Sequence, residues 1–319
     1  MKNGFVAEGS LLSTEENREY LASVEGLERA RCCGAIVEAI VICCDSALRL
    51  HVDLGCAEGI VEAEEAVYCR EGEVRKDIAV ISRVGKPIAF VITEIVRRDG
   101  HTVAHLSRRQ AQARCLRYYL DTARTGDLIR ARVTHLEGFG AFLDVGCGVS
   151  SLLSVDCISV SRISHPRDRL SVGMTVNVVI KAIDREGGRI YVSLRELLGT
   201  WEENAARFSV GQTVTGIIRS VESYGIFVEL APNLAGLAEL REGADEELRA
   251  AIGRPVAVYI KSIVPDRMKI KLILIDTDCT HAPARALPYF VDPEATHHLS
   301  RWVYSPASSK RLVESVFEE

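Results

Sequence analysis

Two pairs of aromatic residues carry the clearest binding chemistry in this sequence. Phe139 and Phe142 lie in "LEGFGAFLDVG", and Tyr224 and Phe227 repeat the spacing in "VESYGIFVELA". Aromatic rings exposed on a strand are stacking platforms for nucleic-acid bases, worth about 1–3 kcal/mol per base whatever the base. The alternative is that the rings are core residues of a barrel. Their recurrence beside a glycine, in a chain with only 6% aromatic residues, favours exposure.

The three-residue spacing of each pair requires an irregular backbone if both rings are to face the same way. Residues three apart do not point to the same face of a regular strand. Gly140, or a bulge beside it, is therefore expected to twist the strand so that Phe139 and Phe142 face the same way. On the preceding β-rich run, Arg132 and His135 would extend the same track along a phosphate backbone.

These residues recur on repeated elements. The runs "GDLIRARVTHLEGFGAFLDVG" and "VGMTVNVVIKAIDREGGRIYVSLRE" match "GQTVTGIIRSVESYGIFVEL" and "GRPVAVYIKSIVPDRMKIKLILI" further along the chain. Each set contains five short β-rich runs with one long irregular connection, which predicts a small closed barrel of the oligonucleotide-binding (OB) type. A fainter copy begins at Gly34, and it has Leu48 and His51 where the middle copy has Phe139 and Phe142.

The predicted fold is mainly β: three tandem five-stranded OB-fold barrels joined by short helices, with an N-terminal helix and an irregular C-terminal tail. Ser13 and Glu16 have capping-box spacing for the N-terminal helix. Trp201, in the second linker, is expected to pack on a barrel, and the closing "KRLVESVFEE" predicts a short helical run. The expected divisions are an N-terminal helical segment (1–29), a degenerate repeat one (30–108), a helical linker (109–124), an RNA-binding repeat two (125–196), a helical linker (197–209), an RNA-binding repeat three (210–275) and the tail (276–319).

The composition is that of an ordinary globular protein. The chain is 47% hydrophobic and 26% charged, which supports a packed core. A net charge of −5 excludes a uniformly basic coat, so any RNA binding must come from local faces. The N-terminus has no apolar signal region, and no uninterrupted apolar run is long enough to span a membrane. The sequence therefore predicts a cytoplasmic protein without a membrane partner.

No cofactor, metal or enzyme active site is expected. The ten cysteines contain no C-x-x-C pattern, so most are expected to be small buried hydrophobes. Cys279, His281, His297 and His298 have the residue types of zinc ligands, but a surface loop is expected because their spacing is not that of a zinc finger. The chain has no P-loop, H-E-x-x-H or G-x-S-x-G motif, and the repeats leave no room for a catalytic domain.

The middle and last repeats resemble S1 domains, a family of RNA-binding repeats, and the resemblance covers roughly residues 30–275. In that family the RNA-binding face combines two aromatics of the second strand, a His of the third strand, and an Asp and an Arg of the closing hairpin. Here Ser154 and Glu239 stand where the His is usual, and Pro265 stands near the expected hairpin Asp of repeat three. The predicted RNA-binding residues come from this resemblance and from the basic residues of the β-rich run before the first aromatic pair. They are Phe139, Phe142, Asp184, Arg189, Arg132, His135, Ser154, Tyr224, Phe227 and Lys269.

The resemblance also implies a function, namely binding of single-stranded RNA. In this role the protein would hold messenger RNA on the small ribosomal subunit during translation. Repeat one lacks the rings and has Glu62 at the third-strand position. Residues 1–108 are therefore expected to attach to the small ribosomal subunit and not to bind RNA. Two alternatives stay open: a free RNA-binding regulator of messenger RNA stability or translation, and a protein-binding adaptor, which a pI near 6.0 would suit.

Overall fold

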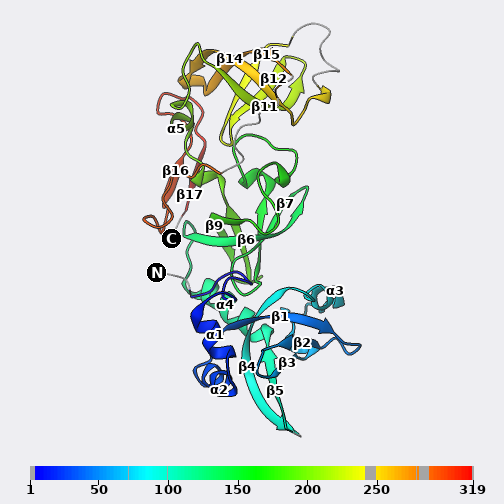
Figure 1. The fold of residues 1–319 in the computed structure, drawn as a ribbon. Coiled ribbons are helices and arrows are strands. Elements are labelled where there is room, and N and C mark those ends of the chain that lie inside the picture. Colours follow the sequence, from blue (N-terminus) through cyan, green and yellow to red (C-terminus); the bar gives the residue numbers. More distant parts are fainter. Residues whose placement is uncertain are drawn as a thin grey trace.

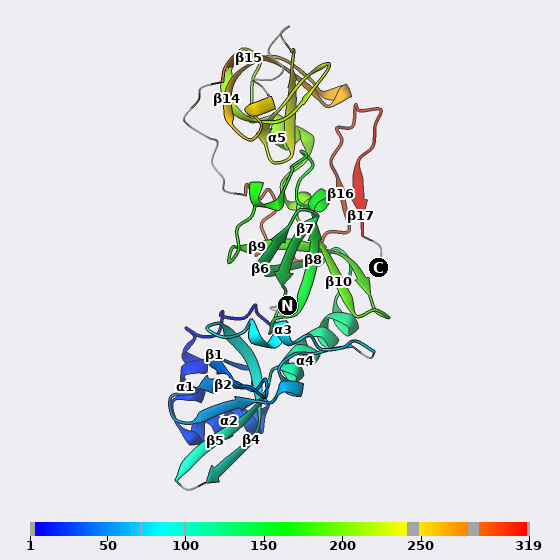
Figure 2. The same ribbon diagram turned by 90° about the vertical axis from the view of Figure 1, so that its right-hand side faces the viewer.

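The computed structural model describes residues 4–70, 72–98, 100–240, 249–277, 279 and 287–317. Three closed five-stranded barrels lie in a row along the molecule, with repeat one at one end and repeat three at the other (Figure 1 and Figure 2). The predicted mainly-β fold of three OB-like barrels is confirmed. Each barrel encloses a hydrophobic core of its own.

The three barrels share one topology. In each, the first strand pairs with the second and the fourth, and the third strand runs parallel to the fifth. Burial alternates along the strands because successive side chains point to opposite faces of the sheet, so apolar residues fill the barrel and polar ones face outward. The strands are β1 Val37–Cys44, β2 Leu50–Asp53, β3 Glu58–Val61, β4 Pro87–Arg98 and β5 His101–Ser107 in repeat one, β6 Leu128–Glu137, β7 Gly140–Asp144, β8 Ser150–Ser154, β9 Thr175–Asp184 and β10 Arg189–Ser193 in repeat two, and β11 Thr213–Glu222, β12 Gly225–Ala231, β13 Leu234–Ala238, β14 Pro255–Val264 and β15 Lys269–Asp276 in repeat three.

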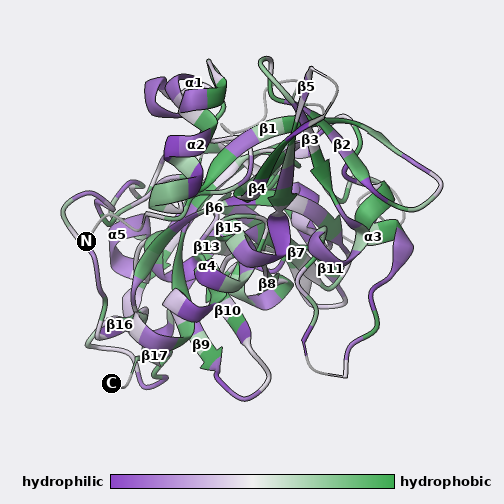
Figure 3. Ribbon diagram, turned by 90° about the horizontal axis from the view of Figure 1, so that it is seen from below, coloured by the Kyte–Doolittle hydropathy of each residue, from purple (hydrophilic) through white to green (hydrophobic). Residues whose placement is uncertain are grey.

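The N-terminal segment forms two helices where one was expected. They are α1 Glu15–Leu21 and α2 Val24–Cys33. Thr14 and Ser23 are the N-caps, and each side chain accepts a main-chain N–H of its first turn. The predicted cap at Ser13 is wrong by one position, because two hydroxyl residues in a row can both serve and the backbone selects the second. Seen from the repeat-one end, both helices show hydrophilic and hydrophobic stretches (Figure 3), as helices that cover a barrel do.

Two further helical segments connect the barrels. Helix α4 Arg108–Thr122 joins repeats one and two, and its buried side packs into the core of repeat two. Helix α5 Trp201–Ala205 lies in the second linker, and Trp201 is only 2% exposed in the core of repeat three. The prediction that Trp201 packs on a barrel is thus confirmed. A short helix, α3 Asp77–Ile81, lies in the long connection of repeat one.

The C-terminal segment, residues 287–317, is an ordered strap and not an irregular tail. It lies beside repeats two and three in both views (Figure 1 and Figure 2). Strands β16 Arg301–Val303 and β17 Glu314–Val316 pair in it, so the predicted terminal helix is wrong. Trp302 and Tyr304 enter the core of repeat three, while Phe317 packs against repeat two. Pairing and burial outweigh the local helix propensity.

Candidate nucleic-acid interface

The start of strand β7 presents the first aromatic pair. Phe139 lies in the turn directly before the strand and is 57% exposed, and Phe142 is half-buried within the strand. The ring centroids are 6.0 Å apart and the planes meet at 89°. Among the described residues, the core of repeat two contains neither ring. The two rings therefore form an edge-to-face pair on the outside of the barrel.

The glycine between the rings is required by a close approach of strands. A Cβ atom at Gly140 would lie 2.5 Å from the carbonyl oxygen of Leu153 on β8. The bulge falls on the other neighbour, β6, just before His135. The rings meet with Phe139 in the turn before the strand and Phe142 within it, so the bulge that was the alternative to Gly140 lies on the neighbouring strand.

His135 extends the aromatic pair. Its ring stacks on Phe142, with the centroids 6.3 Å apart and 29° between the planes. Its Nε2 lies 2.7 Å from Oε1 of Glu137. The side chains of His135, Phe142 and Phe139 therefore make one continuous surface, bordered by a carboxylate.

The two predicted hairpin residues have different surroundings. Asp184 Oδ1 accepts the main-chain N–H of Gly187 at 2.7 Å, so this carboxylate holds the β9–β10 turn. Arg189 is exposed and pairs across the ladder with Asp184. It lies two residues before Tyr191, which is the member of β10 in the same row as Phe142. Arg189 is thus free to reach a phosphate beside the stacking surface, while Asp184 has a structural task.

Arg132 and Ser154 differ in their distance from the rings. Arg132 is half-buried at the junction of repeats one and two, where its guanidinium donates to the carbonyl oxygen of Glu8 at 3.1 Å. Ser154 pairs with Gly140 across the ladder and donates its hydroxyl to Asp156. The structure therefore brings Ser154 beside the rings and places Arg132 at the inter-repeat contact.

Two residues that the sequence reasoning missed continue this surface. Phe142 pairs with Leu152, and Leu152 pairs with Tyr191, so the half-buried Tyr191 lies in the row of the stacking ring. Lys181 is exposed at the bulge between β9 and β10, and its Nζ lies 3.1 Å from Sγ of Cys157. Strict alternation in "RIYVS" was a signal that the tyrosine faces outward.

Repeat three repeats the geometry. Tyr224 is 66% exposed in the turn before β12, and its ring meets that of Phe227 at 6.1 Å and 90°. Phe227 pairs with Leu237, and Leu237 pairs with Lys271, so a lysine takes the place that a tyrosine has in repeat two. Lys269 is exposed at the start of β15. The outer face of repeat three thus combines a ring pair with lysine side chains.

The acidic residue of this face has a cation beside it. Glu239 follows β13, and its Oε1 lies 3.9 Å from Nζ of Lys261. Both side chains are exposed. The repulsion of phosphate expected from Glu239 is therefore partly offset by Lys261.

Repeat one has no ring pair in the equivalent place. His51 occupies the position of Phe142, with Nδ1 2.9 Å from Oε1 of Glu58 and Nε2 3.3 Å from Oδ2 of Asp45. The hydrogen bond to Glu58, helped by Asp45, raises the pKa of His51. This histidine lies between carboxylates and does not offer a free stacking surface.

The described part of the chain contains no cluster of three or more His, Cys, Asp or Glu side chains that could hold a metal ion. His298, one of the zinc-type residues, has its Nδ1 2.9 Å from Oδ1 of Asp127. His281 lies outside the described residues. Within the described ranges, no helix has the length and apolar character needed to cross a membrane.

Comparison with known proteins agrees with this geometry. Residues 122–195 match the S1 RNA binding domain. A small ribosomal subunit protein bS1 from Staphylococcus saprophyticus is 36% identical over 124 residues, which is 39% of this chain and 31% of that protein. The protein of the same name from Leuconostoc lactis is 35% identical over 155 residues, 46% of this chain and 35% of its own. The chain thus spans about a third of the length of these relatives.

One solved structure aligns over a longer stretch. It is a multidomain protein with nucleic acid binding domains from Streptococcus pneumoniae, and it covers 76% of this chain and 73% of its own length. The sequence identity is 14% and the TM-score is 0.23.

Proposed function

Because residues 122–195 match the S1 RNA binding domain, we propose that this protein holds single-stranded RNA on repeats two and three. The observation that carries the proposal is the recurrence of one exposed edge-to-face ring pair, Phe139 with Phe142 and Tyr224 with Phe227, at the same turn of two barrels. Bases must be unpaired and splayed to stack on such rings, so a single strand fits and a duplex does not.

The RNA in this proposal is messenger RNA on the small ribosomal subunit, since the curated relatives are small ribosomal subunit proteins. Residues 1–108 would attach the protein to the subunit, because the outer face of repeat one around His51 carries carboxylates and no ring pair. The protein would act by binding, without catalysis, in the cytoplasm.

Two measurements test the proposal. Titration of the full chain with a labelled single-stranded RNA, and with the duplex of the same sequence as control, should give clearly tighter binding of the single strand. Co-sedimentation with small ribosomal subunits should persist at a salt concentration that releases free RNA. Equal affinity for duplex and single strand would contradict the stacking mechanism.

A further inference from the structure

One corner of the barrel is equivalent in all three repeats. It consists of the last acidic residue of the second strand and two outward residues of the first strand, and we call it the upstream corner. The pairing register makes the equivalence explicit, because Val41–Val52, Val133–Leu143 and Ile218–Val228 are corresponding ladder pairs. The corner is Ile40, Ile42 and Asp53 in repeat one, Arg132, Thr134 and Asp144 in repeat two, and Ile217, Arg219 and Glu229 in repeat three.

In repeat two the upstream corner is covered by the N-terminal segment. Asp144 is 4% exposed, and its Oδ2 accepts the main-chain N–H of Glu8 at 2.8 Å. Arg132 donates to the carbonyl oxygen of the same residue at 3.1 Å. The Glu8 carboxylate in turn pairs with Arg108, with 2.6 Å between Nε and Oε1. This corner is therefore the seat on which the preceding part of the chain docks.

In repeat three the same corner is covered by repeat two. Glu229 is 5% exposed and forms ion pairs with Arg169 of repeat two and with Arg219 of its own barrel, the latter at 2.7 Å. Arg219 also reaches Asp168, with 3.2 Å between its NH1 nitrogen and Oδ2. In both junctions the buried acid accepts from an N–H group of the preceding segment: a main-chain amide in one and a guanidinium in the other.

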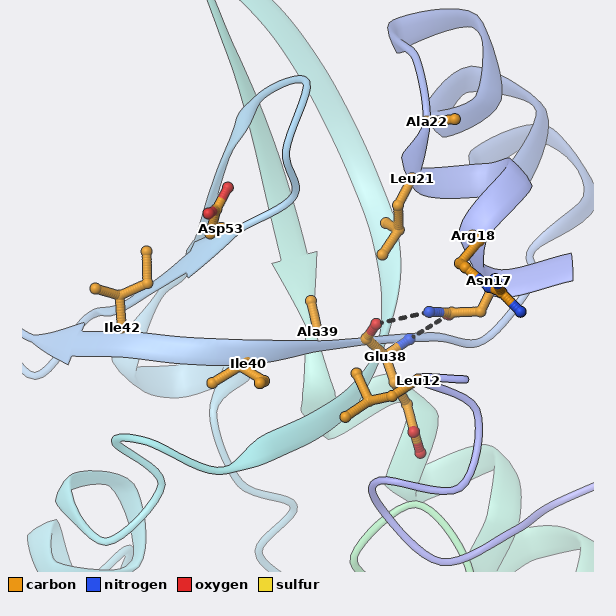
Figure 4. A pocket seen from close by; sticks show the side chains of 10 residues that line it. All are labelled: Leu12, Asn17, Arg18, Leu21, Ala22, Glu38, Ala39, Ile40, Ile42 and Asp53. Atoms are coloured by element: carbon orange, nitrogen blue, oxygen red, sulfur yellow. Dashed lines mark hydrogen bonds between the residues drawn. The ribbon is translucent and has the colours of Figure 1, made fainter. Parts of the chain in front are cut away.

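In repeat one the upstream corner faces solvent. Ile40 is 50% exposed and Ile42 is 58% exposed. Asp53 is exposed, and its carboxylate accepts the N–H of Gly55 within its own turn at 2.7 Å. Leu12 and Leu21 of the N-terminal segment line the same hollow (Figure 4). Repeats two and three each have an arginine of their own at this corner, Arg132 and Arg219, whereas repeat one has two half-exposed isoleucines beside its acid.

The chemistry of this hollow favours a protein and disfavours RNA. Among the described residues, the cation that lines it is Arg18, which donates to the carbonyl oxygens of Ser13 and Thr14 at 2.9 and 3.3 Å. Glu38 also lines it, fully buried, and its Oε1 has no hydrogen-bond partner among the described residues. Affinity for a phosphate backbone needs cations, whereas an apolar patch beside an acid suits an apolar segment that carries an arginine.

We infer that the upstream corner of repeat one is a docking seat for a protein segment that presents an arginine to Asp53 and an apolar side chain to Ile40 and Ile42. The contact would copy the one that Arg169 makes with Glu229 inside this chain. The inference rests on the proposed attachment of residues 1–108 to the small ribosomal subunit, and it names the surface and the kind of segment.

The test uses the full chain and purified, salt-washed small ribosomal subunits, with excess single-stranded oligonucleotide added to occupy the stacking faces. The variants are Ile42→Asp, which makes the patch polar, and Asp53→Asn, which keeps the turn acceptor and removes the charge. The matched control is Ile78→Asp, since Ile78 is 66% exposed on α3 of the same repeat and does not line the hollow. We expect each corner variant to weaken co-sedimentation at least tenfold, with the control, the melting temperature and the affinity for free RNA unchanged.

Three results would overturn the seat, and they are distinguishable. If the parent chain sediments and both variants sediment equally well, the corner is not the seat while the proposed attachment stands. If Asp53→Asn binds more tightly than the parent, the corner faces phosphate and not an arginine. If the parent fails to sediment, the proposed attachment fails and the seat with it.

Discussion

At the scale of one residue, substitution of Phe139 can test RNA binding independently of stability. Its ring is 57% exposed and touches Phe142 edge to face, outside the core. Phe139→Ala should therefore weaken single-stranded RNA binding by about 1–3 kcal/mol, roughly a fivefold to hundredfold loss in affinity, while the melting temperature stays that of the parent. Fluorescence titration and thermal unfolding measure the two effects.

A matched control for Phe139→Ala is Tyr68→Ala. Tyr68 is an aromatic residue of repeat one that is 36% exposed and lies away from the ring pairs. Its removal should leave the RNA affinity unchanged. A melting temperature that drops for Phe139→Ala while RNA affinity per folded molecule is kept would mean that the ring is a structural residue.

Glu38 predicts a pH dependence of stability. Burial raises its pKa from 4.5 to about 7, although hydrogen bonds from the main-chain N–H groups of Leu11 and Gly9 act in the opposite direction. The folded chain then binds a proton that the unfolded chain lacks between about pH 4.5 and 7, so this group adds stability as the pH falls through that window. Glu38→Gln keeps an acceptor for both N–H groups and should raise the melting temperature at pH 8 and flatten its pH dependence.

The measurement is thermal unfolding of the parent and of Glu38→Gln at steps from pH 5.5 to pH 8. Glu28→Gln serves as control, because Glu28 is a partly exposed side chain of α2 paired with Arg31 at 2.8 Å. Parallel curves for parent and Glu38→Gln would show that the buried carboxyl stays charged throughout.

The C-terminal strap matters most at the scale of elements. Trp302 is 7% exposed in the core of repeat three, so the strap completes the core of a barrel whose first strand begins about ninety residues earlier. Trp302→Ala should cost about 3–5 kcal/mol of unfolding free energy, as truncation of a buried aromatic does. Val316→Ala, on the paired strand and with Val316 55% exposed, should cost little.

Denaturant unfolding measures this loss of unfolding free energy, and native-state hydrogen exchange shows which strands it affects. Protection should fall on β11 to β15 and stay unchanged on β1 to β5. An equal loss in all three barrels would mean that the strap stabilises the chain as one cooperative unit.

The sequence predicted what depends on local pattern. The five strands of each barrel follow from alternation and β-branched runs, and the ring pairs follow from their recurrence beside a glycine. It could not predict that Arg132 turns to Glu8, that Asp184 closes its own turn, or that residues 301–316 pair as strands. The partner of Arg132 lies more than a hundred residues away in the chain, so no local spacing encodes that contact. The Asp184 turn and the β16–β17 pair are local, but the residue types alone do not distinguish them from the alternatives expected, a binding residue and a helix.

At the scale of the whole molecule, RNA affinity should be confined to two of the three barrels. The full chain with Phe139, Phe142, Tyr224 and Phe227 all changed to alanine keeps repeat one intact. It should lose single-stranded RNA binding almost entirely, because the equivalent face of repeat one is His51 held by two carboxylates and affinity for RNA needs cations and free rings.

The measurement is titration of this variant with single-stranded RNA at low salt, where residual binding is easiest to see. Circular dichroism checks that the barrels remain folded. Affinity within tenfold of the parent would show that repeat one, or a surface away from the rings, carries RNA.

The strap has a consequence for the order in which the protein forms. A ribosome releases the chain from its N-terminus, and domains fold as they emerge. Strands β11 to β15 are made before Trp302 and Tyr304, yet the core of repeat three includes both. A nascent chain can therefore close its first barrel early, while the third must wait, incompletely packed, until residue 304 has left the exit tunnel.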